Sequence, residues 1–244
     1  MTLIFAHRGF SASFPENTMM AFIEAEKEQA DGIELDVHLT KDGEPVVIHD
    51  ERVDRTTDGT GYVKDFTFKQ LRNLDAAWYH HRSVRKEPIP SLREVFEWLG
   101  SNDLLCNVEL KTEKIPYQGI EQIVASLIRK YQLEERIIVS SFNHYSIITH
   151  YRLAPEIEIA PLFKDGLFMP WIYAKSIRAK GFHPHYRFAT NELIKASMGN
   201  GIAVRPYTVN KEKELHRLFK IGCSAVITDE PAKAARIKKQ YHTC

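Results

Sequence analysis

The fold of this chain is decided by the stretch Gly32-Ile33-Glu34-Leu35-Asp36-Val37-His38. Its alternation of aliphatic and polar residues predicts a β-strand, in which residues two apart project from the same face. Glu34, Asp36 and His38 therefore share one face, and the aliphatic side chains occupy the other. Aliphatic side chains can pack under helices, whereas unpaired buried carboxylates are costly. We therefore expect a bound divalent cation on the acidic face.

A second strand follows after a tight turn. The dipeptide Asp42-Gly43 is a strong turn signal, and residues 45–50 form a largely apolar run that reaches His49. The connection is too short for a crossover helix, so the two strands must pair in antiparallel fashion. With the turn centred near 41–42, Glu34 is predicted to lie nearly opposite His49, which puts a histidine beside the carboxylates.

Beyond this hairpin, strand and helix patterns alternate to the end of the chain. If the second hairpin strand is a return strand, eight strands remain, and eight strands alternating with helices predict an α/β fold, the (β/α)8 TIM barrel. The expected strands are 2–6, 32–39, 45–50, 104–111, 136–142, 157–163, 181–185, 202–210 and 225–228. The expected helices are 16–29, 91–100, 120–131, 143–152, 170–179, 190–199, 211–220 and 231–241. We expect a single domain over residues 1–244, with a small insertion at about 51–90 over the barrel mouth.

Composition restricts the partners of this protein. The formal net charge is +1, so there is no global basic field for nucleic acid or an anionic membrane, and any anion must bind locally. No apolar stretch approaches the ~20 residues that span a bilayer, and the first residues do not resemble a signal peptide. The three cysteines form no zinc or redox motif. We expect a cytoplasmic protein with reduced thiols, no nucleic-acid partner and no stable membrane insertion.

The polar residues at the strand ends suggest phosphate chemistry, because barrel enzymes place their sites at the carboxyl ends of the strands. Three carboxylates on neighbouring strands make an all-oxygen site that favours one Mg²⁺ or Ca²⁺ over zinc. Two cations beside them can bind the oxygens of a phosphate group. Two histidines at strand ends can supply a general base and a general acid. The residues are Glu34, Asp36 and Glu109 for the metal, Arg8 and Lys111 for the phosphate, and His7 and His49 for proton transfer.

These motifs, taken in order, resemble the glycerophosphodiester phosphodiesterase family. The matching segments span nearly the whole chain and are His7-Arg8-Gly9, Glu16-Asn17-Thr18, Glu34-Leu35-Asp36-Val37, Pro45-Val46-Val47-Ile48-His49-Asp50, Glu109-Leu110-Lys111, Ser140-Ser141-Phe142, Thr208-Val209-Asn210 and Thr228-Asp229-Glu230-Pro231. The resemblance implies a barrel with an insertion near the return hairpin. It also implies metal-dependent hydrolysis of glycerophosphodiesters to sn-glycerol 3-phosphate and an alcohol.

The resemblance extends to the site residues. It implies that His7 and His49 are the acid–base pair, that Glu34, Asp36 and Glu109 bind the metal, and that Arg8 and Lys111 contact the phosphate. Further substrate-binding positions are Glu16, Phe142 and Tyr207. At Tyr207 members of the family often carry Trp, so the glycerol end of the pocket gains a hydroxyl.

Other interpretations stay open from the sequence. Residues 16–18 also suit a helix start, and Phe142 also suits simple packing. The apolar segment 166–173 suits burial of the following helix or a weak lipid contact at Phe168 to Trp171. Alternative functions are a lysophospholipase D-type enzyme, a cyclising phospholipase-like enzyme, and a non-catalytic module that binds phosphodiesters.

Overall fold

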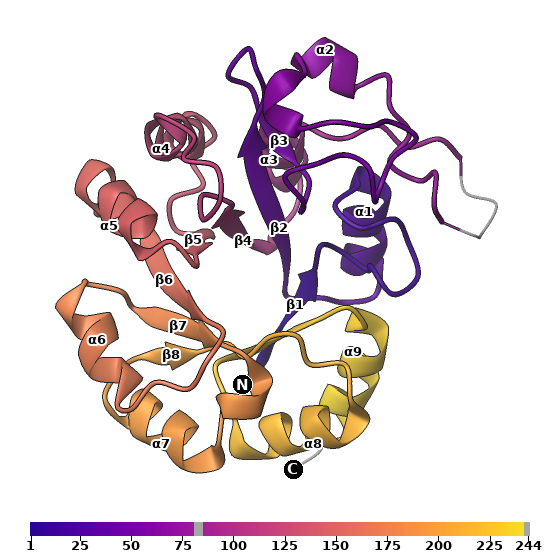
Figure 1. The fold of residues 1–244 in the computed structure, drawn as a ribbon. Helices are drawn as coiled ribbons and strands as arrows, with labels where there is room; N and C mark the ends of the chain where they lie inside the picture. The colour runs from indigo at the N-terminus through magenta and orange to yellow at the C-terminus, as the bar shows by residue number, and fades with distance from the viewer. Residues whose placement is uncertain (81–84, 242–244) are drawn as a thin grey trace.

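The computed structural model describes residues 1–80 and 85–241 and shows a barrel of parallel strands surrounded by helices (Figure 1). Neighbouring strands follow the order β8-β7-β6-β5-β4-β2-β1-β9. The ring closes just beyond β8, where the Ile227 amide donates to the Pro206 carbonyl and the Val209 amide donates to the Ile227 carbonyl, both at 2.9 Å. The predicted (β/α)8 barrel is confirmed.

The elements lie close to their expected positions. The barrel strands are β1 (Leu3–His7), β2 (Gly32–Leu39), β4 (Leu105–Leu110), β5 (Ile137–Ser141), β6 (Glu158–Phe163), β7 (Gly181–Pro184), β8 (Ala203–Val204) and β9 (Ala225–Thr228), while β3 (Pro45–Val47) pairs with β2 alone. The helices are α1 (Met19–Lys27), α2 (Phe68–Leu71), α3 (Leu92–Leu99), α4 (Ile120–Lys130), α5 (His144–Leu153), α6 (Pro170–Ser176), α7 (Asn191–Gly199), α8 (Glu212–Ile221) and α9 (Pro231–Lys239).

The antiparallel hairpin of β2 and β3 is present, but its register differs by one residue from the expected one. Val37 pairs with Val47, and continuing this register puts His49 opposite Leu35 and not opposite Glu34. The turn is centred on Asp42, because the Thr40 amide donates to the Glu44 carbonyl at 3.0 Å. The expected centre lay half a residue earlier, which is enough to shift the pairing by one.

A buried histidine of β2 fixes His49 despite this shift. His38 is fully buried, and its Nε2 lies 3.0 Å from the carbonyl oxygen of His49. Its Nδ1 lies 2.9 Å from the hydroxyl of Tyr117. Burial lowers the pKa of His38 to about 4, so the ring is neutral near pH 7 and donates from Nε2 to the carbonyl. The third polar residue of the acidic strand therefore supports the end of the hairpin.

Strand β8 is the element that differs most from expectation. The expected strand covered 202–210, whereas the ladder is regular only over Ala203–Val204. Pro206 lacks a backbone N–H and cannot continue a ladder. Beyond it, Tyr207 still pairs with His185 as an isolated parallel bridge. The chain thus leaves the sheet early but stays beside it up to the barrel mouth.

The interior of the barrel contains an apolar cluster below its mouth. Phe5, Ile138, Ala160, Ala225 and Ile227 form a buried cluster inside the ring. Two larger clusters fill the layer between the strands and the outer helices. Polar groups also lie beside the cluster inside the ring, since Arg205 donates to Glu158 at 2.7 Å near Leu3 and Phe5.

The segment after β3 builds a small core of its own against the hairpin, beside the barrel (Figure 1). It contains a 3₁₀ turn (Val63–Asp65) and α2. Its buried apolar side chains pack on two residues of the hairpin, and the cluster consists of Val46, Ile48, Val53, Val63, Leu71, Ala76 and Ile89. The described parts of the expected insertion at about 51–90 are thus anchored next to the return strand, close to His49.

Gly32 provides a test of the packing around β2. A Cβ at this position would lie 2.7 Å from the carbonyl oxygen of Leu105 and 2.9 Å from the ring of Phe5. We predict that Gly32→Ala destabilises the protein by about 1–3 kcal/mol, because the neighbouring backbone must move. Urea unfolding monitored by circular dichroism measures the difference.

Gly199→Ala is the matched control. Gly199 ends α7, and a Cβ there would meet no atom within 4 Å. This change should leave stability unaltered or raise it by up to about 1 kcal/mol, because alanine favours helix. Equal effects of the two substitutions would contradict the packing argument.

Candidate active site

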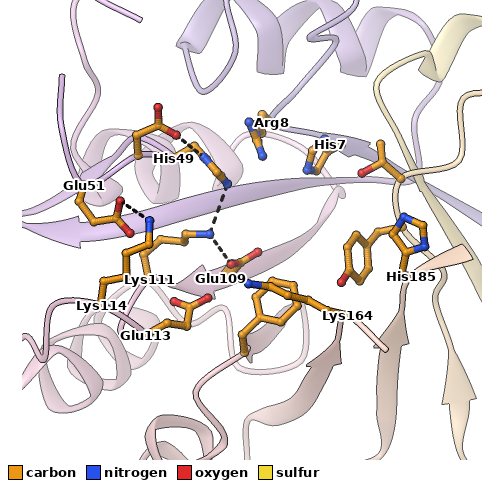
Figure 2. Close-up of a pocket in the computed structure, with 14 residues that line it drawn as sticks. His7, Arg8, His49, Glu51, Glu109, Lys111, Glu113, Lys114, Lys164 and His185 are labelled. Atoms are coloured by element: carbon orange, nitrogen blue, oxygen red, sulfur yellow. Dashed lines mark hydrogen bonds and ion pairs between the residues drawn. The ribbon is translucent and has the colours of Figure 1, made fainter. Parts of the chain in front are cut away.

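A cavity of about 410 Å³ opens at the carboxyl ends of the strands (Figure 2). Most of the side chains predicted from the sequence line it, namely His7, Arg8, His49, Glu109, Lys111, Phe142 and Tyr207. Of the others, Glu34 and Asp36 are buried beside it, at 2% and 1% exposure. Glu16 does not line the cavity and instead binds Arg8 at its edge.

Three buried carboxylates form the centre of the site. Asp36 of β2 is the direct neighbour of Glu109 of β4 in the parallel ladder, and Glu34 lies two residues before Asp36 on the same face. One oxygen from each of these carboxylates lies within 4.8 Å of the others. The Oδ1 atom of Asp36 accepts no hydrogen bond from any residue that the structure describes. This cluster of hard oxygen donors fits a divalent cation.

Burial and mutual repulsion act strongly on these acids. Burial, followed by the charges of its neighbours Asp36 and Glu109, raises the pKa of Glu34 well above its usual range. Burial also raises the pKa of Glu109. For Asp36 burial acts in the same direction, but the Lys111 ammonium and the Arg8 guanidinium outweigh it and hold the pKa well below its usual range. The cluster therefore needs positive charge to stay ionised.

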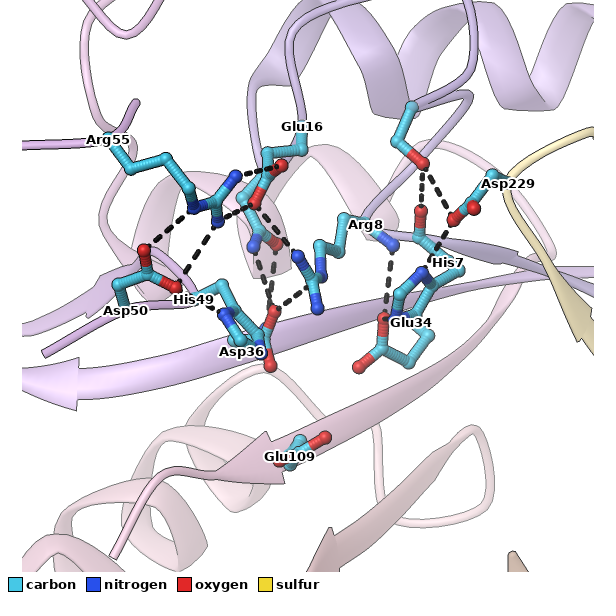
Figure 3. A network of polar contacts seen from close by, with 12 residues as sticks. His7, Arg8, Glu16, Glu34, Asp36, His49, Asp50, Arg55, Glu109 and Asp229 are labelled. Carbon is cyan, nitrogen blue, oxygen red and sulfur yellow. Dashed lines mark hydrogen bonds and ion pairs between the residues drawn. The ribbon is translucent and has the colours of Figure 1, made fainter. Parts of the chain in front are cut away.

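Two cations supply such charge from the protein itself. The Lys111 ammonium lies 2.7 Å from Glu109 and 3.6 Å from Asp36. Arg8 lies 3.3 Å from Asp36 through Nε, and its backbone amide donates to Glu34 at 3.0 Å (Figure 3). Both side chains also line the cavity, so their remaining donors can bind an anion there.

The turn after β1 places Arg8 at this point. Arg8 has a positive φ of 56° and Gly9 a φ of 79°. A Cβ on Gly9 would lie 2.6 Å from the backbone of Ala21, so only glycine fits. The backbone thus turns sharply at the end of the strand, which directs the Arg8 amide and side chain onto the two acids of β2.

Each catalytic candidate histidine is held by a carboxylate at Nδ1. His49 Nδ1 lies 2.6 Å from Asp50, and His7 Nδ1 lies 2.6 Å from Asp229. On the other side of the ring, His49 Nε2 lies 3.3 Å from the Lys111 ammonium, and His7 Nε2 lies 3.9 Å from Glu34. A carboxylate at Nδ1 orients the ring, which leaves Nε2 for proton transfer.

Asp229 was not assigned to the site from the sequence, although its segment Thr228-Asp229-Glu230-Pro231 is among those that resemble the family. Its carboxylate also accepts hydrogen bonds from Ser11 and from Asn210. One signal could have revealed it, because the first and last strands of a closed barrel are neighbours. A carboxylate at the end of β9 must then lie beside a histidine at the end of β1.

The aromatic candidates form one wall of the cavity. The rings of Phe142 and Tyr207 meet edge to face at 5.9 Å. The extra hydroxyl of Tyr207 donates to the carbonyl oxygen of Phe163 at 3.0 Å, so a backbone group satisfies it. Lys164 lies 4.7 Å above the ring of Phe142. These contacts show how the Tyr207 hydroxyl is accommodated in the wall of the cavity.

The comparison with known proteins identifies the family. The model of the glycerophosphoryl diester phosphodiesterase family matches residues 7–233. The chain belongs to this family. A protein of Caldanaerobacter subterraneus subsp. tengcongensis named glycerophosphodiester phosphodiesterase is 46% identical over 94% of this chain and 95% of its own length. One of Bacillus altitudinis with the same name is 43% identical over 98% of this chain and 99% of its own length.

Solved structures of phosphodiesterases share the fold. The phosphodiesterase of Oleispira antarctica, solved in complex with the product sn-glycerol-3-phosphate, superposes with a TM-score of 0.86 and 28% identity. The match covers 98% of this chain and 97% of that one. The family resemblance seen in the motifs is thus confirmed. Within residues 1–80 and 85–241, no helix has the length and apolar character needed to cross a membrane.

Proposed function

We propose that this protein hydrolyses glycerophosphodiesters, such as glycerophosphocholine, to sn-glycerol 3-phosphate and a free alcohol. One observation carries the proposal: two carboxylate-bound imidazoles face the same cavity as Arg8, Lys111 and the buried acidic cluster. Phosphodiester cleavage needs this combination of proton donors and acceptors with positive charge. The names of the relatives and the product in the Oleispira antarctica structure support the same reaction.

We propose that Glu34, Asp36 and Glu109 hold one divalent cation, Mg²⁺ or Ca²⁺. The donors are all carboxylate oxygens, and neither a cysteine sulfur nor a histidine nitrogen belongs to the cluster. When bound, the cation would supply charge that neutralises phosphate oxygens. The remaining steps are carried by side chains of this chain.

In the proposed mechanism Arg8 and Lys111 bind the phosphate oxygens and orient the diester. One histidine removes a proton from the nucleophile at Nε2 as the new P–O bond forms. The other donates a proton from Nε2 to the alcohol oxygen as the old P–O bond breaks. Either histidine can take either role, and we propose His7 as the base and His49 as the acid. The nucleophile is water, or the glycerol 2-hydroxyl through a cyclic phosphate that water then opens.

Three further positions were expected from the sequence to contact the substrate, namely Glu16, Phe142 and Tyr207. Phe142 and Tyr207 are proposed to line the glycerol end of the pocket. For Glu16, direct contact with substrate is less suitable than was expected from the sequence, because both its oxygens already bind arginines.

We also propose a cytoplasmic location and no nucleic-acid partner. Cys106 and Cys223 are free and buried, whereas Cys244 lies outside the described residues.

A lysophospholipase D-type activity is the second candidate, and a second cavity favours it. This cavity, of about 530 Å³, lies beside the first and shares Phe142 with it. Its walls come from α5, α6 and the residues before α5, and include Tyr145, Ile148 and Ile177. An acyl chain attached to a substrate in the first cavity could lie along this apolar surface.

The loop before α6 and the first turn of α6 add exposed apolar area. Phe168 is 86% exposed and Ile172 is 57% exposed, and Leu167 and Met169 are partly exposed. Trp171, in contrast, is half-buried and packs against the core. We therefore propose that a weak lipid contact involves Phe168 and Ile172, and that Trp171 anchors the helix.

The first prediction concerns the histidines. His7→Ala and His49→Ala should each lower kcat roughly 100- to 10,000-fold, the usual contribution of a general acid or base. A coupled assay for glycerol 3-phosphate with glycerophosphocholine measures the effect. His216→Ala on the surface of α8 is the control and should retain wild-type activity. Wild-type rates in both active-site variants would disprove the mechanism, and binding without turnover by the wild type would indicate a non-catalytic module.

The second prediction concerns the cation. EDTA should abolish turnover, and Mg²⁺ or Ca²⁺ should restore it. In calorimetric titration of EDTA-treated protein with each ion, Asp36→Asn should weaken binding about 10- to 100-fold, because it removes one charged ligand. Glu28→Gln, at the exposed end of α1, should bind like the wild type. Full activity in EDTA would rule out the metal assignment.

The third prediction separates the two substrate classes. If an acyl chain uses the exposed loop, Phe168→Ser with Ile172→Ser should lower kcat/KM for a long-chain lysophospholipid about 10- to 100-fold, the equivalent of losing one or two buried apolar contacts. Turnover of glycerophosphocholine should not change. Met198→Ser, an exposed apolar residue of α7, is the control. Unchanged lysophospholipid turnover and unchanged co-sedimentation with vesicles would exclude the lipid contact.

A further inference from the structure

Arg55, in the segment after the hairpin, binds two carboxylates at the edge of the active site. Its Nε donates to Asp50 at 2.7 Å, and its Nη1 and Nη2 donate to the two oxygens of Glu16 at 2.8 and 2.7 Å (Figure 3). A further contact joins Nη2 to Asp50 at 3.3 Å. One planar guanidinium thus holds both carboxylates in a fixed orientation.

Each of these two carboxylates also contacts a residue of the proposed mechanism. Asp50 Oδ1 lies 2.6 Å from Nδ1 of His49. Glu16 Oε1 accepts from Nη1 of Arg8 at 3.0 Å, and Arg8 in turn pairs with Asp36. Arg55 itself does not line the catalytic cavity. Its hydrogen bonds connect it to the proposed catalytic groups through Asp50 and Glu16.

We propose that Arg55 is a positioning residue that fixes the imidazole of His49 through Asp50 and the guanidinium of Arg8 through Glu16. This inference rests on the function proposed above and extends it to a residue of the segment after β3. Arg55 can fix both groups because its single guanidinium binds the carboxylates of Asp50 and Glu16 at the same time. Without Arg55, Asp50 and Glu16 repel each other and can rotate away from His49 and Arg8.

If Arg55 formed only an ordinary surface ion pair, its loss would change neither the stability nor the activity of the protein appreciably. The side chain of Arg55 is 46% exposed, and exposed pairs contribute little to stability. The melting temperature of Arg55→Gln should therefore change by no more than about 2–4 °C. Activity should change far more, because loss of a group that orients a catalytic side chain typically costs about 10- to 100-fold.

Two branches of contacts lead from Arg55, one through Asp50 to His49 and one through Glu16 to Arg8. We expect them to have separate kinetic effects. Asp50→Asn should lower kcat, because His49 loses its charged partner, and Glu16→Gln should raise KM, because Arg8 loses its orientation. Arg55→Gln should do both, with kcat about 10- to 100-fold lower. Arg55→Lys keeps the charge without the planar fork, and should recover part of the loss.

Arg52→Gln is the matched control. Arg52 lies in the same segment, its side chain is 44% exposed, and it pairs with Asp54 away from the cavity. Its loss removes a comparable surface ion pair and should leave kcat and KM unchanged. A general effect of charge in this segment would appear in both variants.

A double-mutant cycle tests whether Arg55 acts on His49 through Asp50. In the Asp50→Asn background, adding Arg55→Gln should lower kcat by less than twofold, because the branch to His49 is already broken. Fully additive losses would overturn the proposal, as would wild-type kcat and KM in Arg55→Gln alone. The active wild type in the same assay shows that such a failure belongs to Arg55 and not to the proposed function.

An NMR measurement on the unliganded protein tests the positioning role of Arg55 without relying on turnover. The Nδ1 proton of His49 should give a low-field NMR resonance in the unliganded protein, assigned by its absence in His49→Ala. This resonance should shift or broaden in Arg55→Gln and persist in Arg52→Gln. An unchanged resonance in Arg55→Gln would overturn the positioning role even if the protein turned over none of the diesters tested.

Discussion

The burial of three carboxylates within 4.8 Å of one another is the constraint on which the rest of the site depends. Such a cluster is unstable without compensation, because burial and mutual repulsion both oppose ionisation. Arg8 and Lys111 approach it from two sides, and Asn17 donates to Asp36 at 2.9 Å. The positive charge that stabilises these acids is also what a phosphodiester requires. In the proposed mechanism, the same two groups stabilise the acidic cluster and bind the phosphate.

Much of this arrangement could be predicted from the sequence, because it depends on regular periodicity. Glu34, Asp36 and Glu109 occupy alternate positions of strands that become neighbours, so their shared face follows from the strand pattern alone. The hairpin register could not be predicted to the residue. It depends on whether Thr40 pairs with Glu44, and that choice is made by hydrogen bonds inside the turn. Residues 45–48 are all apolar, so the hydrophobic pattern of the second strand does not distinguish the two registers.

Asp229 and Arg55 could not be assigned to the site from the sequence, for a related reason. Thr228-Asp229-Glu230-Pro231 fits a helix start as well as it fits a site, and the local sequence cannot separate the two. Arg55 lies in a segment without periodicity, so nothing in the pattern gives the direction of its side chain. Only the packing of that segment on Val46 and Ile48 brings it to Asp50. Residues placed by irregular chain segments thus escape sequence analysis, even when they lie next to predicted ones.

The pair of His7 and Asp229 has a consequence for how the protein is made. The two residues are 222 positions apart, yet they lie 2.6 Å from each other because β1 and β9 are adjacent. During synthesis His7, the acidic cluster and His49 leave the ribosome early, but the partner of His7 emerges only with the last strand. Contacts between distant residues also form late in folding, since long loops must close first. A nascent chain therefore carries most of the proposed catalytic groups before His7 has its partner, and the proposed site is complete only after the ring has closed.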